Sequence, residues 1–208
     1  MNTKKKRRKR KQLPPALQEW LDEIQDWSTG RIWWPRLILL FFFLHLLVSH
    51  IKDPMYSDIF KGLNLGIHEI GHMVFNPFGE FMTVAGGSLL QCLVPLLSTF
   101  MFFRQRDYFG ITVCFAWLST NLFDVAVYAD DARALALPLV TPFKGDETIH
   151  DWNFMLDKLD LMAYDHNIAG ILRLAAIISM LFSIGSGFYL VLLMMQNPKP
   201  NTTAEPEP

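Results

Sequence analysis

Residues 174–195 have the sequence LAAIISMLFSIGSGFYLVLLMM and contain no charged side chain. A helix of this length measures about 33 Å at about 1.5 Å per residue, which is enough to cross the ~30 Å apolar core of a bilayer. Four further segments gather apolar residues in the same way, although the second of these is markedly more polar. We therefore predict an all-α integral membrane protein with about five transmembrane helices, at residues 32–50, 58–77, 82–103, 108–129 and 168–195.

More polar segments flank and interrupt this hydrophobic region. Residues 1–31 combine a basic block with apolar residues that recur at helical spacing over 17–27, which indicates a basic tail and an amphipathic interfacial helix. Residues 32–195 form the predicted transmembrane domain, in which 130–167 is an extramembrane loop with a second amphipathic segment. Residues 196–208 are expected to be a disordered tail.

The basic block, Lys4–Lys11, predicts both a partner and an orientation. No folded basic domain follows it, so we expect it to meet anionic lipid of the bilayer and not nucleic acid. By the positive-inside rule it places the N-terminus in the cytoplasm, and five crossings then place the C-terminus outside. Arg104 and Arg106, which follow the third predicted span, would lie on the non-cytoplasmic side. Either the number of spans or the rule must therefore fail.

The polar second span carries the motif His68-Glu69-Ile70-Gly71-His72. Its two histidines are four residues apart and project from one helical face, the arrangement in which two imidazoles bind one Zn²⁺. The intervening glutamate is then placed to act as general base on a metal-bound water. Each ionisable group at the centre of a membrane helix costs at least ~2.5–3.5 kcal/mol, so three within five residues favour a metal site over a chance pattern.

A catalytic zinc site needs a third protein ligand in addition to water. Asp124 in the fourth span is the leading candidate, because that span runs parallel to the second and its depth agrees with that of the histidines to within ~10 Å. Asp131 and His150 are the alternatives, and both suit a supporting role better than ligation. The competing interpretation of Asp124 is an ion pair with an arginine of the bundle such as Arg173.

Proline and glycine residues surround the start of the third span, at Asn76–Glu80 and Ala85–Ser88. They indicate either a tight turn between two helices or a break in the helix. In the second case the stretch would offer an exposed edge to which an unwound substrate segment adds as a strand. Both alternatives remain open at the level of the sequence.

This arrangement resembles the site-2 protease family of zinc intramembrane metalloproteases. The resemblance covers roughly residues 58–131 and rests on the motif at 68–72, a hairpin with glycines, and a later span that supplies Asn121 and Asp124. In the family, a second motif has Asn, then Pro three residues later, then Asp-Gly. Here Asp124 stands where the proline would be, and the carboxylates at 130–131 lie near the Asp-Gly position.

The resemblance implies hydrolysis of peptide bonds within or beside a substrate's transmembrane segment, with His68 and His72 as zinc ligands and Glu69 as the catalytic base. We therefore expect a zinc-dependent intramembrane protease that acts on membrane-protein substrates, in a bacterial inner membrane. Two alternatives use the same metal. One is a hydrolase of lipids or small amides that employs the same water and base, and the other is a non-catalytic metal-binding scaffold.

Overall fold

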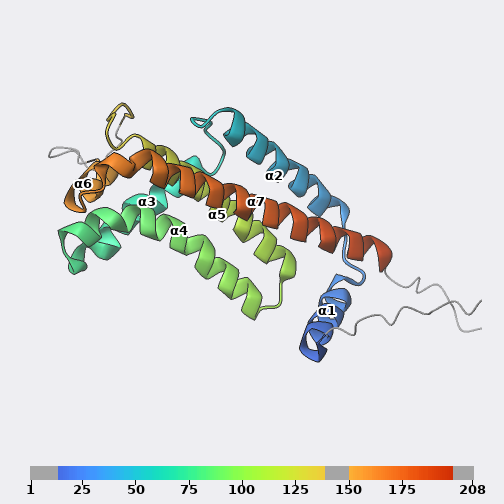
Figure 1. Ribbon diagram of the computed structural model, residues 1–208. Helices are drawn as coiled ribbons and strands as arrows, with labels where there is room; N and C mark the ends of the chain where they lie inside the picture. Colours follow the sequence, from blue (N-terminus) through green and yellow to red (C-terminus); the bar gives the residue numbers. More distant parts are fainter. Residues whose placement is uncertain (1–13, 139–149, 199–208) are drawn as a thin grey trace, which may run out of the picture.

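The computed structural model describes residues 14–138 and 150–198, and within these ranges all regular structure is helical (Figure 1). The elements in chain order are α1 (Pro15–Ser28), α2 (Trp34–Lys52), α3 (Lys61–Phe75), η1 (Asn76–Phe78), α4 (Glu80–Arg104), α5 (Tyr108–Asp130), α6 (Asp151–Lys158), η2 (Met162–Tyr164) and α7 (Asp165–Gln196). The basic block Lys4–Lys11 and most of the predicted C-terminal tail lie outside the described residues.

Four helices, α2, α4, α5 and α7, are long and apolar enough to cross a membrane. The prediction of an all-α membrane protein is therefore confirmed, but the number of spans differs from the five expected. The difference is α3, which has 15 residues and measures about 22 Å, less than the apolar thickness of a bilayer. Asn76-Pro77 and Gly79 end this helix and turn the chain directly into α4.

The centre of the bundle is the pair α5 and α7, which pack closely through small side chains. Ser119 donates a hydrogen bond to the carbonyl of Ala176 at 2.7 Å, and Ser179 donates to the carbonyl of Phe115 at 2.7 Å. Small residues let two membrane helices approach, and hydroxyls that bond across the interface satisfy their own hydrogen-bonding capacity in the absence of water. This pair is the scaffold against which α3 and α4 are placed.

Two glycine contacts hold α3 close to α4. A Cβ at Gly71 would overlap the carbonyl of Gly86, and a Cβ at Gly87 would lie 2.5 Å from Nε2 of His68. Residues 85–88 are helical and lie inside α4, so the hypothesis of an extended edge is wrong and the tight turn is correct. The paired glycines serve close packing of the two helices and leave space for the imidazole ring.

Side-chain contacts show how far α3 reaches along the bundle. Asn64, in its first turn, meets Trp117 near the middle of α5, whereas His72 meets Thr83 near the start of α4. The helix therefore runs from the middle of the bundle to the end where α4 begins and α5 finishes (Figure 1). It does not add a separate crossing of the membrane.

The amphipathic segment predicted at 17–27 forms α1, which lies at the opposite end of the bundle (Figure 1). Trp27 packs edge-on against Tyr108 at the start of α5, with 5.6 Å between ring centroids. Just after α1, the amide of Gly30 donates a hydrogen bond to the carbonyl of Asn197, at 2.8 Å. These contacts bring α1, the α4–α5 turn and the end of α7 together.

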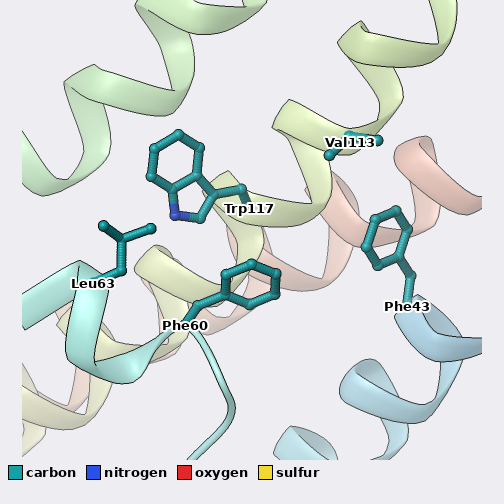
Figure 2. A pocket seen from close by; sticks show the side chains of 5 residues that line it. All are labelled: Phe43, Phe60, Leu63, Val113 and Trp117. Carbon is teal, nitrogen blue, oxygen red and sulfur yellow. The ribbon is translucent and has the colours of Figure 1, made fainter. Parts of the chain in front are cut away.

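An apolar hollow of about 170 Å³ lies between α2, α5 and the start of α3 (Figure 2). The residues that line it are Phe43, Phe60, Leu63, Val113 and Trp117. None of these side chains is a metal ligand or a titratable group. The hollow is therefore distinct from the cluster of polar side chains described next.

Candidate metal centre

Three side chains from two separate parts of the chain converge at the end of the bundle where α4 begins. Oδ2 of Asp151, the first residue of α6, lies 2.9 Å from Nε2 of His68 and 3.3 Å from Nε2 of His72. In a tetrahedral zinc site with bonds of 2.0–2.2 Å, neighbouring ligand atoms are about 3.3–3.5 Å apart. Among the described residues this is the one group of three or more such side chains whose ligand atoms all lie within 4.8 Å of one another.

The two imidazoles are oriented by hydrogen bonds on their other ring nitrogens. Nδ1 of His68 lies 3.1 Å from Oε1 of Gln91, and Nδ1 of His72 lies 2.9 Å from the carbonyl oxygen of Thr83. Carbonyl oxygens only accept hydrogen bonds, so in the neutral rings Nδ1 carries the proton and Nε2 presents a lone pair. Metal-binding histidines in proteins are usually held in this way.

This arrangement places two lone pairs and a carboxylate oxygen against each other. They repel unless a cation, either a proton or a metal ion, lies between them. The set of two imidazole nitrogens and one carboxylate oxygen is the donor chemistry that Zn²⁺ accepts in catalytic sites with a fourth, open position. The residues present therefore fit a zinc ion.

The chain fixes Asp151 through the start of α6. Nδ1 of His150 accepts from the amide of Asn153 and caps the helix, while its Nε2 lies 3.3 Å from Oδ2 of Asp131. The amide of Asp151 itself donates to the hydroxyl of Tyr128, at 3.1 Å. His150 and Asp131, which the sequence offered as alternative ligands, thus support the segment that carries the ligand.

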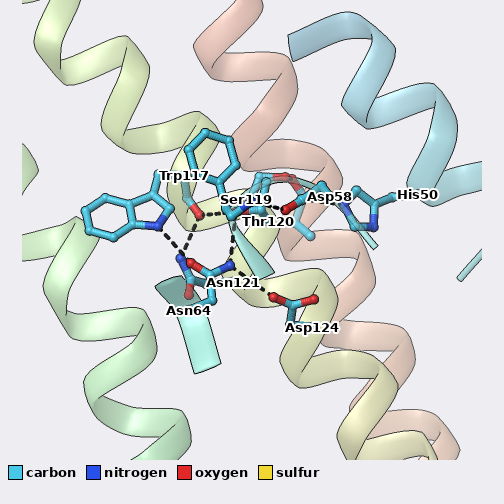
Figure 3. A network of polar contacts seen from close by, with 10 residues as sticks. His50, Asp58, Asn64, Trp117, Ser119, Thr120, Asn121 and Asp124 are labelled. Atoms are coloured by element: carbon cyan, nitrogen blue, oxygen red, sulfur yellow. Dashed lines mark hydrogen bonds and ion pairs between the residues drawn. The ribbon is translucent and has the colours of Figure 1, made fainter. Parts of the chain in front are cut away.

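Asp124, the leading sequence candidate for the third ligand, is not part of this cluster. It belongs to a separate polar network with Asn64 and Trp117 (Figure 3). Its Oδ2 accepts a hydrogen bond from the side-chain amide of Asn64 at 3.0 Å, and Oδ1 of Asn64 accepts from the indole of Trp117 at 2.9 Å. Asn64 is fully buried and lies one helical turn before His68. The carboxylate thus anchors α3 to α5, and Asp151 stands where Asp124 was expected.

The alternative partner proposed for Asp124 is engaged elsewhere. Arg173 donates a hydrogen bond to Oδ2 of Asp130, at 2.5 Å. Two of the remaining histidines also pair with carboxylates: Nε2 of His50 lies 3.0 Å from Asp58 (Figure 3), and Nδ1 of His166 lies 2.5 Å from Asp130. These pairs leave the cluster of His68, His72 and Asp151 as the candidate centre.

Glu69 follows His68 directly in α3 and is half-buried. Within the part of the chain that the structure describes, its carboxylate forms no hydrogen bond or ion pair, in contrast to Asp124, Asp131 and Asp151. A carboxylate next to a candidate metal ligand that is not engaged in holding the fold is free to accept a proton.

No family of proteins, curated protein or solved structure matched this chain when it was compared with them. We therefore infer its function from the geometry of the cluster and from the motif that carries it.

Proposed function

We propose that this protein is a zinc-dependent intramembrane protease that hydrolyses peptide bonds in or near the transmembrane segments of other membrane proteins, in a bacterial inner membrane. One observation supports the proposal above the others. The two histidines of the motif and Asp151 converge with their metal-binding atoms, and both imidazoles are held by Nδ1 on carbonyl oxygens. The resemblance to site-2 proteases in the motif at 68–72 is consistent with it.

Zinc bound here would polarise the scissile carbonyl and lower the pKa of its water toward ~7. His68, His72 and Asp151 would provide three ligands and leave the fourth position for that water. Glu69 would accept the proton of the attacking water and return it to the nitrogen of the departing amine. Gln91 and the carbonyl of Thr83 would keep the two rings in the required orientation throughout.

The decisive experiment is the isosteric change Glu69→Gln. The purified protein is assayed for bound zinc by elemental mass spectrometry, and for turnover with a panel of single-span reporter proteins in proteoliposomes. We expect one zinc per chain in both forms and a loss of about 10²- to 10⁴-fold in cleavage rate, the usual contribution of a general base. Glu80→Gln, an exposed glutamate at the start of α4, is the matched control and should change neither.

Four outcomes would contradict the proposal. A folded wild-type protein that binds no zinc has no metal centre. Full activity of Glu69→Gln would remove the assigned base. Turnover of acyl-ester or amide lipids in mixed micelles, without cleavage of any reporter protein, would assign the same site to a lipid hydrolase. Zinc binding without turnover of either class of substrate would identify a scaffold.

A further inference from the structure

The two ends of the helix bundle differ in their basic residues. One end contains α1, the α4–α5 turn and the end of α7. Its basic residues near the membrane helices are Arg31, Arg36, Arg104 and Arg106, and the eight residues Lys4–Lys11 precede α1 in the sequence. This end is called the basic end below.

The other end contains α6, the α3–α4 turn and the candidate metal centre, and it is called the site end below (Figure 1). Its basic residues in the described ranges are Lys52, Arg133, Lys158 and Arg173. Arg173 donates a hydrogen bond to Asp130, the last residue of α5, whereas Lys61 begins α3 in the middle of the bundle. Arg133 is paired with Asp165 at 2.5 Å. Among the described residues the two ends carry similar numbers of basic side chains, and the difference between them is the block Lys4–Lys11, which precedes α1 in the sequence.

Four crossings remove the conflict that five crossings created. Because α3 returns to the end where α4 begins, the helices α2, α4, α5 and α7 cross alternately and bring both ends of the described chain to the basic end. Arg104 and Arg106 then lie on the same side as Lys4–Lys11. A single orientation satisfies the positive-inside rule for the basic block and for the α4–α5 turn together.

We propose that the basic end faces the cytoplasm, and that the centre formed by His68, His72 and Asp151 acts on polypeptide segments presented at the non-cytoplasmic surface of the membrane. The nature of the substrate rests on the proposed function, whereas the orientation of the centre does not. Eight consecutive cations are retained on the cytoplasmic side because moving them outward would oppose the membrane potential.

The depth of the centre supports access from that surface. Thr83, which holds His72, is three residues into α4, and Gln91, which holds His68, is eleven residues into it. At about 1.5 Å per residue these positions lie about 5 and 17 Å from the start of the helix. Asp151 comes from α6, a helix in the connection between α5 and α7, and not from a span. The centre therefore lies in the outer part of the bundle, near the site end.

Labelling of single cysteines in intact cells tests the orientation independently of activity. Asp157→Cys places a thiol on the exposed side of α6, and Gln105→Cys places one on the exposed α4–α5 turn. Cells that express each variant are treated with a membrane-impermeant maleimide before and after permeabilisation. The unaltered protein gives the background, since Cys92 and Cys114 are half-buried and buried within α4 and α5.

We expect the α6 thiol to be labelled in intact cells and the turn thiol to be labelled only after permeabilisation. The reverse pattern would overturn the orientation, and labelling of both thiols in intact cells, or of neither, would overturn the assignment of four crossings. A failure here leaves zinc binding and the effect of Glu69→Gln unchanged, whereas a failure of the protease proposal leaves the labelling pattern unchanged. The two results can therefore be told apart.

Discussion

Replacement of Asp151 by asparagine should remove most of the affinity for zinc. The change preserves shape but removes the charge that faces Nε2 of both His68 and His72 at 2.9 and 3.3 Å. Zinc in a four-ligand protein site is bound with about 10–16 kcal/mol, or about 2.5–4 kcal/mol for each ligand. At about 1.4 kcal/mol for each tenfold change, Asp151→Asn should weaken zinc binding by about 10²- to 10³-fold.

The assay is a competition titration of the purified protein against a chromophoric zinc chelator. Asp124→Asn is the critical comparison, because it makes the same chemical change in the residue favoured by the sequence alone. Its amide oxygen can still accept the hydrogen bond from Asn64, so zinc affinity should change by less than about tenfold. Asp157→Asn, on the exposed side of α6, should have no effect. If Asp124→Asn lost zinc while Asp151→Asn retained it, the ligand assignment would be refuted.

Two further changes test the surroundings of the centre, and a third tests the packing of α1 at the opposite end of the bundle. Gln91→Leu removes the acceptor for Nδ1 of His68 and should lower zinc affinity about 10- to 100-fold in the same titration. Gly71→Ala should lower the thermal unfolding temperature, because its Cβ would overlap the backbone of α4, whereas Gly66→Ala, with open space around it, should not. The ion pair with Arg106 lowers the pKa of Glu23. The stabilisation of α1 by this pair should therefore be fully present above the unfolded pKa of ~4.3, and it should be lost as the pH falls through the lower pKa of the folded state. Tryptophan fluorescence should report this release, and Glu23→Gln should abolish its pH dependence.

The membrane helices could be predicted because their signal is local. A run such as 174–195 excludes charge over its whole length, and only a helix satisfies its backbone in lipid. The segment 58–77 was predicted as a span for its length, but hydropathy does not distinguish a crossing from a helix that returns to the same end. That distinction depends on Asn64, which bonds to the middle of α5, and on the turn after Phe75.

The part of the candidate site that could be predicted is also local in the sequence. His68, Glu69 and His72 are linked by one helical turn, so a periodicity argument finds them together. Asp151 lies 83 residues after His68 and outside every span, and the comparison of depths that favoured Asp124 applies only to residues within spans. One sequence signal was available. Acidic residues are favoured in the first turn of a helix, so Asp151 indicates that the amphipathic segment begins there, and His150 caps this helix.

The comparison of depths selected Asp124 as a partner of His68 and His72, but its carboxylate meets α3 at Asn64, one helical turn before His68. Asn64, His68 and His72 repeat every four residues along one face of α3. The bonds of Asn64 to Asp124 and to Trp117 fix the rotation of this face, and the contact of Gly71 with Gly86 fixes its distance from α4. The polar side chains of α3 thus have two roles: Asn64 fixes the helix against α5, and His68 and His72, in the next two turns, direct their imidazoles toward Asp151.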